Sequence, residues 1–96
     1  MQCQDVLQIV RNHQLQLEAL GVKSLDVFGS VARNQAKVDS DVDFLVEFSR
    51  PVGFFGLFEV QHYLESILNR AVDLGTVKAL KAHLQEPILQ DRVRVF

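Results

Sequence analysis

The sequence contains a single cysteine, Cys3, so it cannot form an internal disulfide, and this predicts a protein of the reducing cytoplasm. No stretch approaches the run of about 18 apolar residues that a membrane-spanning helix needs. The N-terminal segment has neither a continuous apolar stretch nor a strongly basic lead-in, so no secretory signal is expected. Basic residues are not in excess either, because the net charge is -2. A protein that coats nucleic acid would usually be clearly basic, so direct nucleic-acid binding is not expected.

The composition is that of an ordinary globular protein. The chain has 96 residues, of which 48% are hydrophobic and 23% charged. A chain of this length suits one domain with its own hydrophobic core. It shows no internal repeat, low-complexity segment or linker, so we expect one domain over residues 1–96.

Hydrophobic spacing predicts alternating helices and strands. Apolar residues three and four positions apart predict helices, and short apolar runs bounded by turn residues predict strands. Gly21 is a plausible end for the first helix. The predicted helices cover residues 5–20, 30–36, 54–70, 76–83 and 87–92, and the predicted strands cover residues 24–28, 42–48 and 71–75. The expected fold class is α/β (α+β), with a mixed sheet of three or four strands flanked by helices.

Three aspartates fall at alternate positions where the second predicted strand begins: Asp39, Asp41 and Asp43. Successive strand side chains point to opposite faces, so Asp41 and Asp43 are expected on the same face. Two ionised carboxylates at this spacing repel each other, and a divalent cation such as Mg²⁺ would remove the conflict. The alternative is a solvated strand end with turn-capping residues, and Asp39 is assigned to that structural role.

A Gly-Ser pair precedes these aspartates at the end of the first predicted strand. Gly29 has no Cβ, which would let a ligand approach the backbone, and Ser30 could offer its hydroxyl to phosphate oxygens. Ser30 could equally be a plain helix cap. The whole pattern, G-S-x10-D-x-D, should occur by chance in about one chain per thousand of this length. It indicates a nucleoside triphosphate held by its phosphates at Ser30 and through metal at Asp41 and Asp43.

The segment GSVARNQAKVDSDVDFLV resembles the signature of polymerase-β-type nucleotidyltransferases. The resemblance is closest to the minimal nucleotidyltransferases that serve as antitoxins beside HEPN-domain ribonuclease toxins, and it covers nearly the whole chain. It implies nucleotidyl transfer from a triphosphate with two Mg²⁺ ions and three carboxylates. It also implies that Asp41 and Asp43 bind the metal ions and that Gly29 and Ser30 contact the phosphates.

The resemblance supplies the third carboxylate. Asp73, within AVDLG, matches the family's acidic residue on a later strand, where it would complete the metal site and accept the proton of the incoming hydroxyl. By position alone, Asp73 could as well cap the following helix near Thr76. Arg33, one helical turn beyond the Gly-Ser pair, could neutralise phosphate charge or be a solvated surface arginine. Asn34 departs from the glycine that the family often has there.

Other conspicuous residues are assigned structural roles. The three histidines are far apart and lack the spacing of zinc ligands. Phe54, Phe55 and Phe58 are expected in the core, although they could stack a base or form a partner interface. Arg92 and Arg94 are expected to be no more than a solvated basic end of the chain.

The resemblance implies an antitoxin enzyme that transfers AMP from ATP to a hydroxyl, expected to be a tyrosine, of a partner HEPN toxin. Two alternatives remain open. One is an antitoxin that neutralises its toxin only by binding, in a hetero-oligomer, and the other is nucleotidyl transfer to a small molecule or an RNA end. Three clustered carboxylates favour an enzyme, because a protein that only binds gains nothing from them.

Overall fold

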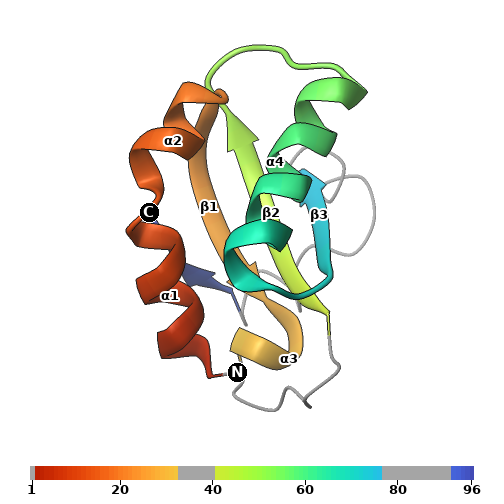
Figure 1. Ribbon diagram of the computed structural model, residues 1–96. Coiled ribbons are helices and arrows are strands. Elements are labelled where there is room, and N and C mark those ends of the chain that lie inside the picture. Colours follow the sequence, from red (N-terminus) through yellow and green to blue (C-terminus); the bar gives the residue numbers. More distant parts are fainter. Residues whose placement is uncertain (1, 33–40, 77–91) are drawn as a thin grey trace.

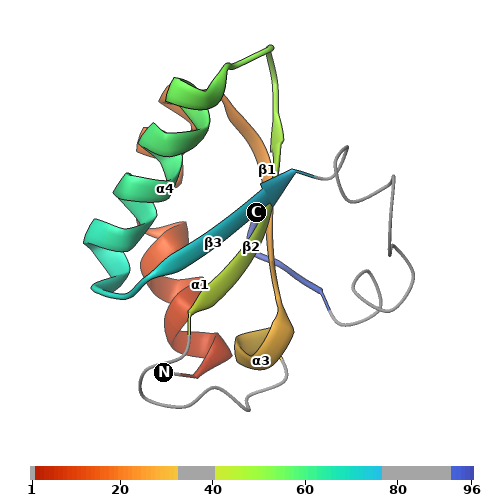
Figure 2. The same cartoon turned by 90° about the vertical axis from the view of Figure 1, so that its right-hand side faces the viewer.

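The structure, a computed structural model that describes residues 2–32, 41–76 and 92–96, is a four-stranded sheet with helices packed against one face (Figures 1 and 2). Its elements are α1 (Cys3–Arg11), α2 (Gln14–Ala19), β1 (Val22–Phe28), α3 (Gly29–Ala32), β2 (Val42–Phe48), α4 (Phe54–Leu68), β3 (Val72–Thr76) and β4 (Val93–Arg94). The strand order is β3-β2-β1-β4, with β2 and β3 parallel and the other pairs antiparallel. The predicted mixed sheet is confirmed.

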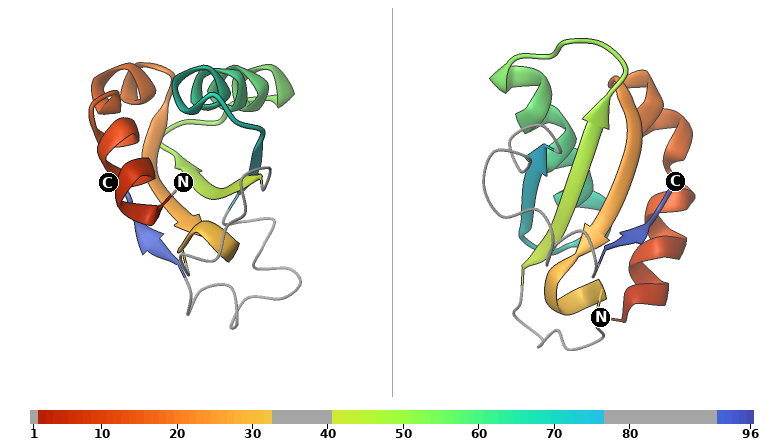
Figure 3. Two further views of the ribbon diagram at one scale, coloured as in Figure 1. Left: turned by 60° about the horizontal axis from the view of Figure 1, so that its bottom comes forward. Right: turned by 180° about the vertical axis from the view of Figure 1, so that it is seen from behind.

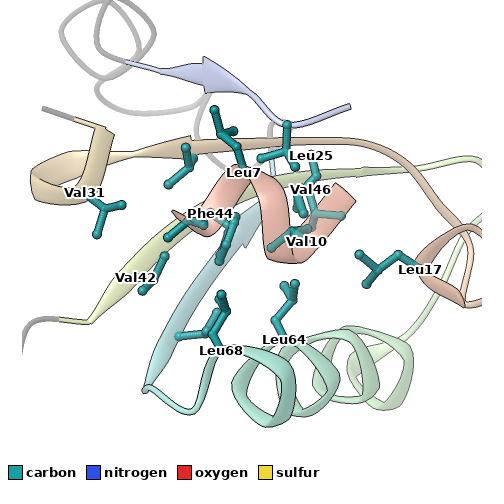
Figure 4. Close-up of a cluster of buried hydrophobic side chains, with 14 of the residues drawn as sticks. Leu7, Val10, Leu17, Leu25, Val31, Val42, Phe44, Val46, Leu64 and Leu68 are labelled. Carbon is teal, nitrogen blue, oxygen red and sulfur yellow. The ribbon is translucent and has the colours of Figure 1, made fainter. Parts of the chain in front are cut away.

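Strand β2 builds the centre of the core with alternate residues. Val42, Phe44 and Val46 are buried on the face that α1 and α4 cover. There they pack with Val10 of α1 and Leu64 of α4 (Figure 4). Burying each such side chain contributes about 1.5–3 kcal/mol, so the face that these residues occupy is strongly specified. The intervening residues of β2 therefore point to the opposite face of the sheet, where the candidate site lies.

The first predicted helix, over 5–20, is wrong as a continuous element. It is divided into α1 and α2 at Asn12 and His13. These are weaker helix formers than the residues around them. Nδ1 of the His13 ring also lies 2.8 Å from the Tyr63 hydroxyl of α4. This hydrogen bond fixes the chain at the break. The helix pair ends at Gly21 as expected, and that glycine has a φ of +99°.

The other described elements lie close to their predicted places. Strand β2 spans all of the predicted 42–48, and β1 begins at Val22, two residues early. Strand β3 is shifted one residue towards the C-terminus, and α4 ends at Leu68. Asn69 ends α4 in the left-handed conformation, with a φ of 55°. None of the helices in the described ranges is long and apolar enough to cross a membrane.

The C-terminal end differs from its prediction. Thr76 closes β3 rather than opening a helix over 76–83, and Arg92 precedes β4 rather than ending a helix over 87–92. The remainder of those two predicted helices, and residues 33–36 of the predicted helix 30–36, lie outside the described residues. Strand β4 was not predicted, because a pairing of two residues produces no periodic signal.

The phenylalanines expected in the core are on the surface. The exposed fractions of Phe54, Phe55 and Phe58 are 79%, 86% and 51%. Helix α4 packs through Val60 and Leu64, which are buried and four residues apart. Phe58 lies two positions before Val60, about 200° around the helix, so it faces away from the sheet. The first two turns of α4 therefore present an exposed aromatic patch, Phe54, Phe55 and Phe58.

Candidate active site

The candidate site begins at the tight turn from β1 into α3. Phe28, the last residue of β1, pairs with Asp43 of β2, and Gly29 then turns the chain with a φ of +74°. A Cβ on Gly29 would overlap the Oδ2 atom of Asp43. Glycine is thus required twice, by the left-handed backbone and by the carboxylate that lies against it. The turn and the Asp43 carboxylate fit together only because residue 29 has no side chain.

Strand register brings the second and third predicted carboxylates together. Asp43 of β2 and Asp73 of β3 are direct partners in the parallel pairing. Paired strands lie about 4.8 Å apart, and paired residues project on the same face. Asp41, two residues before Asp43, is expected on that face as well. Asp41 and Asp73 are exposed and Asp43 is half-buried, so the carboxylates line an accessible end of the sheet, close to α3 (Figure 1).

Two of the predicted phosphate contacts are described incompletely. The backbone of Ser30 lies in α3, directly after Gly29, which keeps it beside the carboxylates. Its side chain lies outside what the structure describes, as does the whole of Arg33. The proposed phosphate contacts of these two residues therefore stay predictions.

The carboxylates are suited to share a metal ion with a substrate. Within residues 2–32, 41–76 and 92–96, no three His, Cys, Asp or Glu side chains converge tightly enough to hold a metal ion by themselves. Mg²⁺ is usually bound by one or two carboxylates together with substrate phosphates and waters, rather than by a closed protein cage. Asp43 and Asp73, paired in register beside a turn with no Cβ, fit that open kind of site.

A charged group on the same face was missed by the sequence reasoning. Asp26 of β1 is 2% exposed, and its Oδ2 accepts a hydrogen bond of 3.4 Å from Nη1 of Arg92. Nε of Arg94 lies 2.6 Å from Oδ1 as an ion pair. Arg92 and Arg94 are therefore not just a solvated end, and that prediction is wrong. Two features of the sequence could have indicated this group. Asp26 is a charged residue inside the apolar run SLDVF, and Arg92 and Arg94 alternate with apolar residues in DRVRVF.

Comparison with known proteins identifies the family of the chain. The family model of the nucleotidyltransferase domain matches residues 6–95. The protein adenylyltransferase MntA of Thermococcus cleftensis is 37% identical over 93 residues, covering 96% of this chain and 94% of MntA. A solved structure assigned as a minimal nucleotidyltransferase superposes with a TM-score of 0.79 at 32% identity, over 97% of this chain and 95% of that chain.

A more distant solved structure shares the fold. It is the complex of a tri-AMPylated Shewanella oneidensis HEPN toxin with its MNT antitoxin, with a TM-score of 0.66 at 18% identity. The match covers 94% of this chain and 71% of that chain. The family and the enzyme class expected from the sequence are confirmed by the family model and by MntA. The chain belongs to the nucleotidyltransferase domain family.

Proposed function

We propose that this protein is an antitoxin that transfers AMP from ATP to a hydroxyl group, that of a tyrosine, on a partner HEPN toxin. The observation that carries the proposal is the register of Asp43 with Asp73, directly beside the Gly29 turn. It gathers acidic oxygens where a triphosphate can approach the backbone. The similarity to MntA, a protein adenylyltransferase, and to the antitoxin of the AMPylated HEPN complex supports a protein acceptor and AMP as the transferred group.

The carboxylates would divide the work between them. Asp41 and Asp43 would hold two Mg²⁺ ions, with Asp73 completing the set of ligands. Magnesium bound there would lower the pKa of the acceptor hydroxyl and neutralise charge on the departing pyrophosphate. Ser30 and Arg33 would contact the phosphates.

The chain's own residues would orient the reaction and accept its proton. The acceptor oxygen forms a bond to the α-phosphorus of ATP while the bond from that phosphorus to pyrophosphate breaks. Asp73 would take the hydroxyl proton, because it is exposed beside Asp43 and open to a protein acceptor. Gly29 would leave room for the phosphates next to the backbone, since it carries no Cβ.

Neutralisation by binding alone is the second candidate, and the exposed aromatic patch of α4 favours it. Phe54 and Phe55 are 79% and 86% exposed, so two large apolar side chains of α4 lie mostly in solvent. Contiguous exposed apolar side chains commonly mark protein interfaces. The two candidates are separable, because only the first requires the carboxylates.

The test is label transfer from α-labelled ATP and Mg²⁺ to the HEPN protein encoded beside this one. The unmodified chain should add AMP to the toxin, seen as added mass and mapped to a hydroxyl residue. Asp73→Asn should keep nucleotide binding and slow transfer by about 10²–10⁴-fold, since it removes the proton acceptor. Glu18→Gln, the same chemical change at an exposed carboxylate on α2, should transfer at the normal rate.

The result that would overturn catalysis comes from cells. If the double variant Asp41→Asn with Asp43→Asn still protects fully against the toxin at natural expression levels, neutralisation is steric. If protection is lost while the variant folds and still binds the toxin, binding alone is insufficient and the transferase proposal stands.

A further inference from the structure

A buried aspartate borders the candidate site on the side away from Asp73. Asp26 pairs with Leu45 across β1 and β2, and Leu45 lies two residues from Asp43. Asp26 and Asp43 are thus diagonal neighbours on the same face, a relation in which side chains start about 7–8 Å apart. Groups bound to Asp26 lie within reach of whatever the Asp43 carboxylate binds.

Two guanidinium groups meet this one carboxylate. Arg94 is opposite Asp26 in the β1–β4 pairing, and its Nε lies 2.6 Å from Oδ1. Nη1 of Arg92 lies 3.4 Å from Oδ2, at the long limit for a hydrogen bond. The Asp26 side chain is 3% exposed, whereas those of Arg92 and Arg94 are 36% and 57% exposed. The group therefore carries a net charge of +1 and can still be reached by an anion.

The C-terminal segment that carries the arginines is fixed in place. Arg11 of α1 donates hydrogen bonds to the carbonyls of Val95, at 2.7 Å, and Arg94, at 3.2 Å. The Val95 side chain is buried in the core, and its N–H donates to the Leu25 carbonyl at 2.8 Å. Figure 3 shows β4 alongside β1 near the end where α3 follows. The arginines are thus held at a defined position on the sheet.

We propose that Arg92 binds the triphosphate of the nucleotide, and that Asp26 and Arg94 position it. This inference rests on the proposed function, because it assumes that the nucleotide lies at the carboxylates. In β4, Val93 is opposite Val27, so Arg92 lies next to Phe28, the residue before the Gly29 turn. Asp43 and Asp73 would hold Mg²⁺ against the triphosphate, and the Arg92 guanidinium would contact it from the β4 side of the sheet.

The two arginines have different roles because Asp26 holds them unequally. Nε of Arg94 lies 2.6 Å from Oδ1 as an ion pair without the geometry of a hydrogen bond, so Arg94 keeps a positive charge beside the buried carboxylate when Arg92 moves. The longer bond of Arg92 can then be exchanged for a phosphate oxygen without leaving a buried charge unpaired. A guanidinium–phosphate contact is charge-assisted and can be bidentate, which makes the exchange favourable.

The inference is tested with Arg92→Gln by calorimetric titration of ATP and of AMP, each with Mg²⁺, in the full-length chain. ATP affinity should fall about tenfold or more, while AMP affinity should stay within about twofold, because the contact is to phosphates that AMP lacks. Arg92→Lys should recover part of the ATP affinity. Arg50→Gln is the matched control: its guanidinium donates to the Ala19 carbonyl at 3.4 Å, away from the carboxylates, and it should match the unmodified chain.

Equal losses for ATP and AMP, or no loss for either, would overturn the role of Arg92. A melting temperature that falls while ATP affinity is kept would show that the ion pair serves stability alone. The proposed function is judged separately, on label transfer by the unmodified chain. Binding that depends on Arg92 without any transfer would overturn the transferase and leave this inference standing. Transfer that is insensitive to Arg92→Gln at subsaturating ATP would do the reverse.

Discussion

Replacing Gly29 by alanine tests the contact on which the candidate site depends. Gly29 has a φ of +74°, and an added Cβ would overlap Oδ2 of Asp43. The new methyl group therefore has two consequences. It strains the turn between β1 and α3, and it forces the Asp43 carboxylate out of its position beside Asp73.

The expected magnitudes follow from these two effects. A side chain in the left-handed region costs about 1–2 kcal/mol. Turning the Asp43 carboxylate away from a favourable rotamer adds about 0.5–1.5 kcal/mol. The free energy of unfolding should therefore fall by about 1.5–3.5 kcal/mol, which lowers the melting temperature by roughly 6–28 °C in a domain of this size. Displacing a catalytic group by about 1 Å can cost about 100-fold in rate.

Calorimetric melting and label transfer below the melting transition measure the two effects independently. Gly53→Ala is the matched control, because Gly53 has a φ of -80° and nothing within 4 Å of an added Cβ. It should change stability by no more than about 1 kcal/mol, since its only cost is a poorer cap for α4. If Gly29→Ala melts and transfers label as Gly53→Ala does, the close fit of Gly29 and Asp43 is irrelevant to the site.

Two further predictions concern the edges of the fold. Arg11→Ala should lower the free energy of unfolding by about 1–2 kcal/mol, because it removes two hydrogen bonds that hold the C-terminal strand, and Arg11→Lys should restore part of it in the same denaturant titration. Burial raises the pKa of the Cys3 thiol, partly offset by Arg11, so Cys3 should react with a thiol reagent near pH 8.5 at least about tenfold more slowly in the folded chain than in denaturant. Equal rates in the two states would contradict the burial. Because the folded thiol stays protonated where the unfolded one ionises, stability should also decrease as the pH rises above the ordinary thiol pKa.

Much of the fold could be predicted because its signals are local. The alternation in VDFLVEF gave β2 its correct limits and placed Asp43 on the face opposite Val42 and Phe44. The Gly-Ser turn and the pair Asp41 and Asp43 were also recognisable from type and spacing, whereas Asp73 was assigned only through the family resemblance. Here hydrophobic period and turn chemistry agree with the final packing, which is when local reasoning succeeds.

The remaining features depend on contacts between distant parts of the chain. The break between α1 and α2 involves a contact of His13 with Tyr63, 50 residues away. Asp26 received no role in the sequence analysis, because its partner Arg92 lies 66 residues further on. The register that joins Asp43 to Asp73 is set only when α4 carries the chain from β2 to β3. No periodicity in a single segment contains that information.

Strand β2 contributes residues both to the core and to the candidate site. Val42, Phe44 and Val46 are buried on one face of β2, and this fixes Asp43 on the other face. A one-residue slip would bury the carboxylate and expose Phe44, so the hydrophobic core enforces the geometry of the site. We expect a loss of core packing to abolish transfer even in a chain that stays folded, because transfer requires Asp43 and Asp73 to keep their register. The hydrophobic face of β2 is in this sense part of the catalytic machinery that we propose.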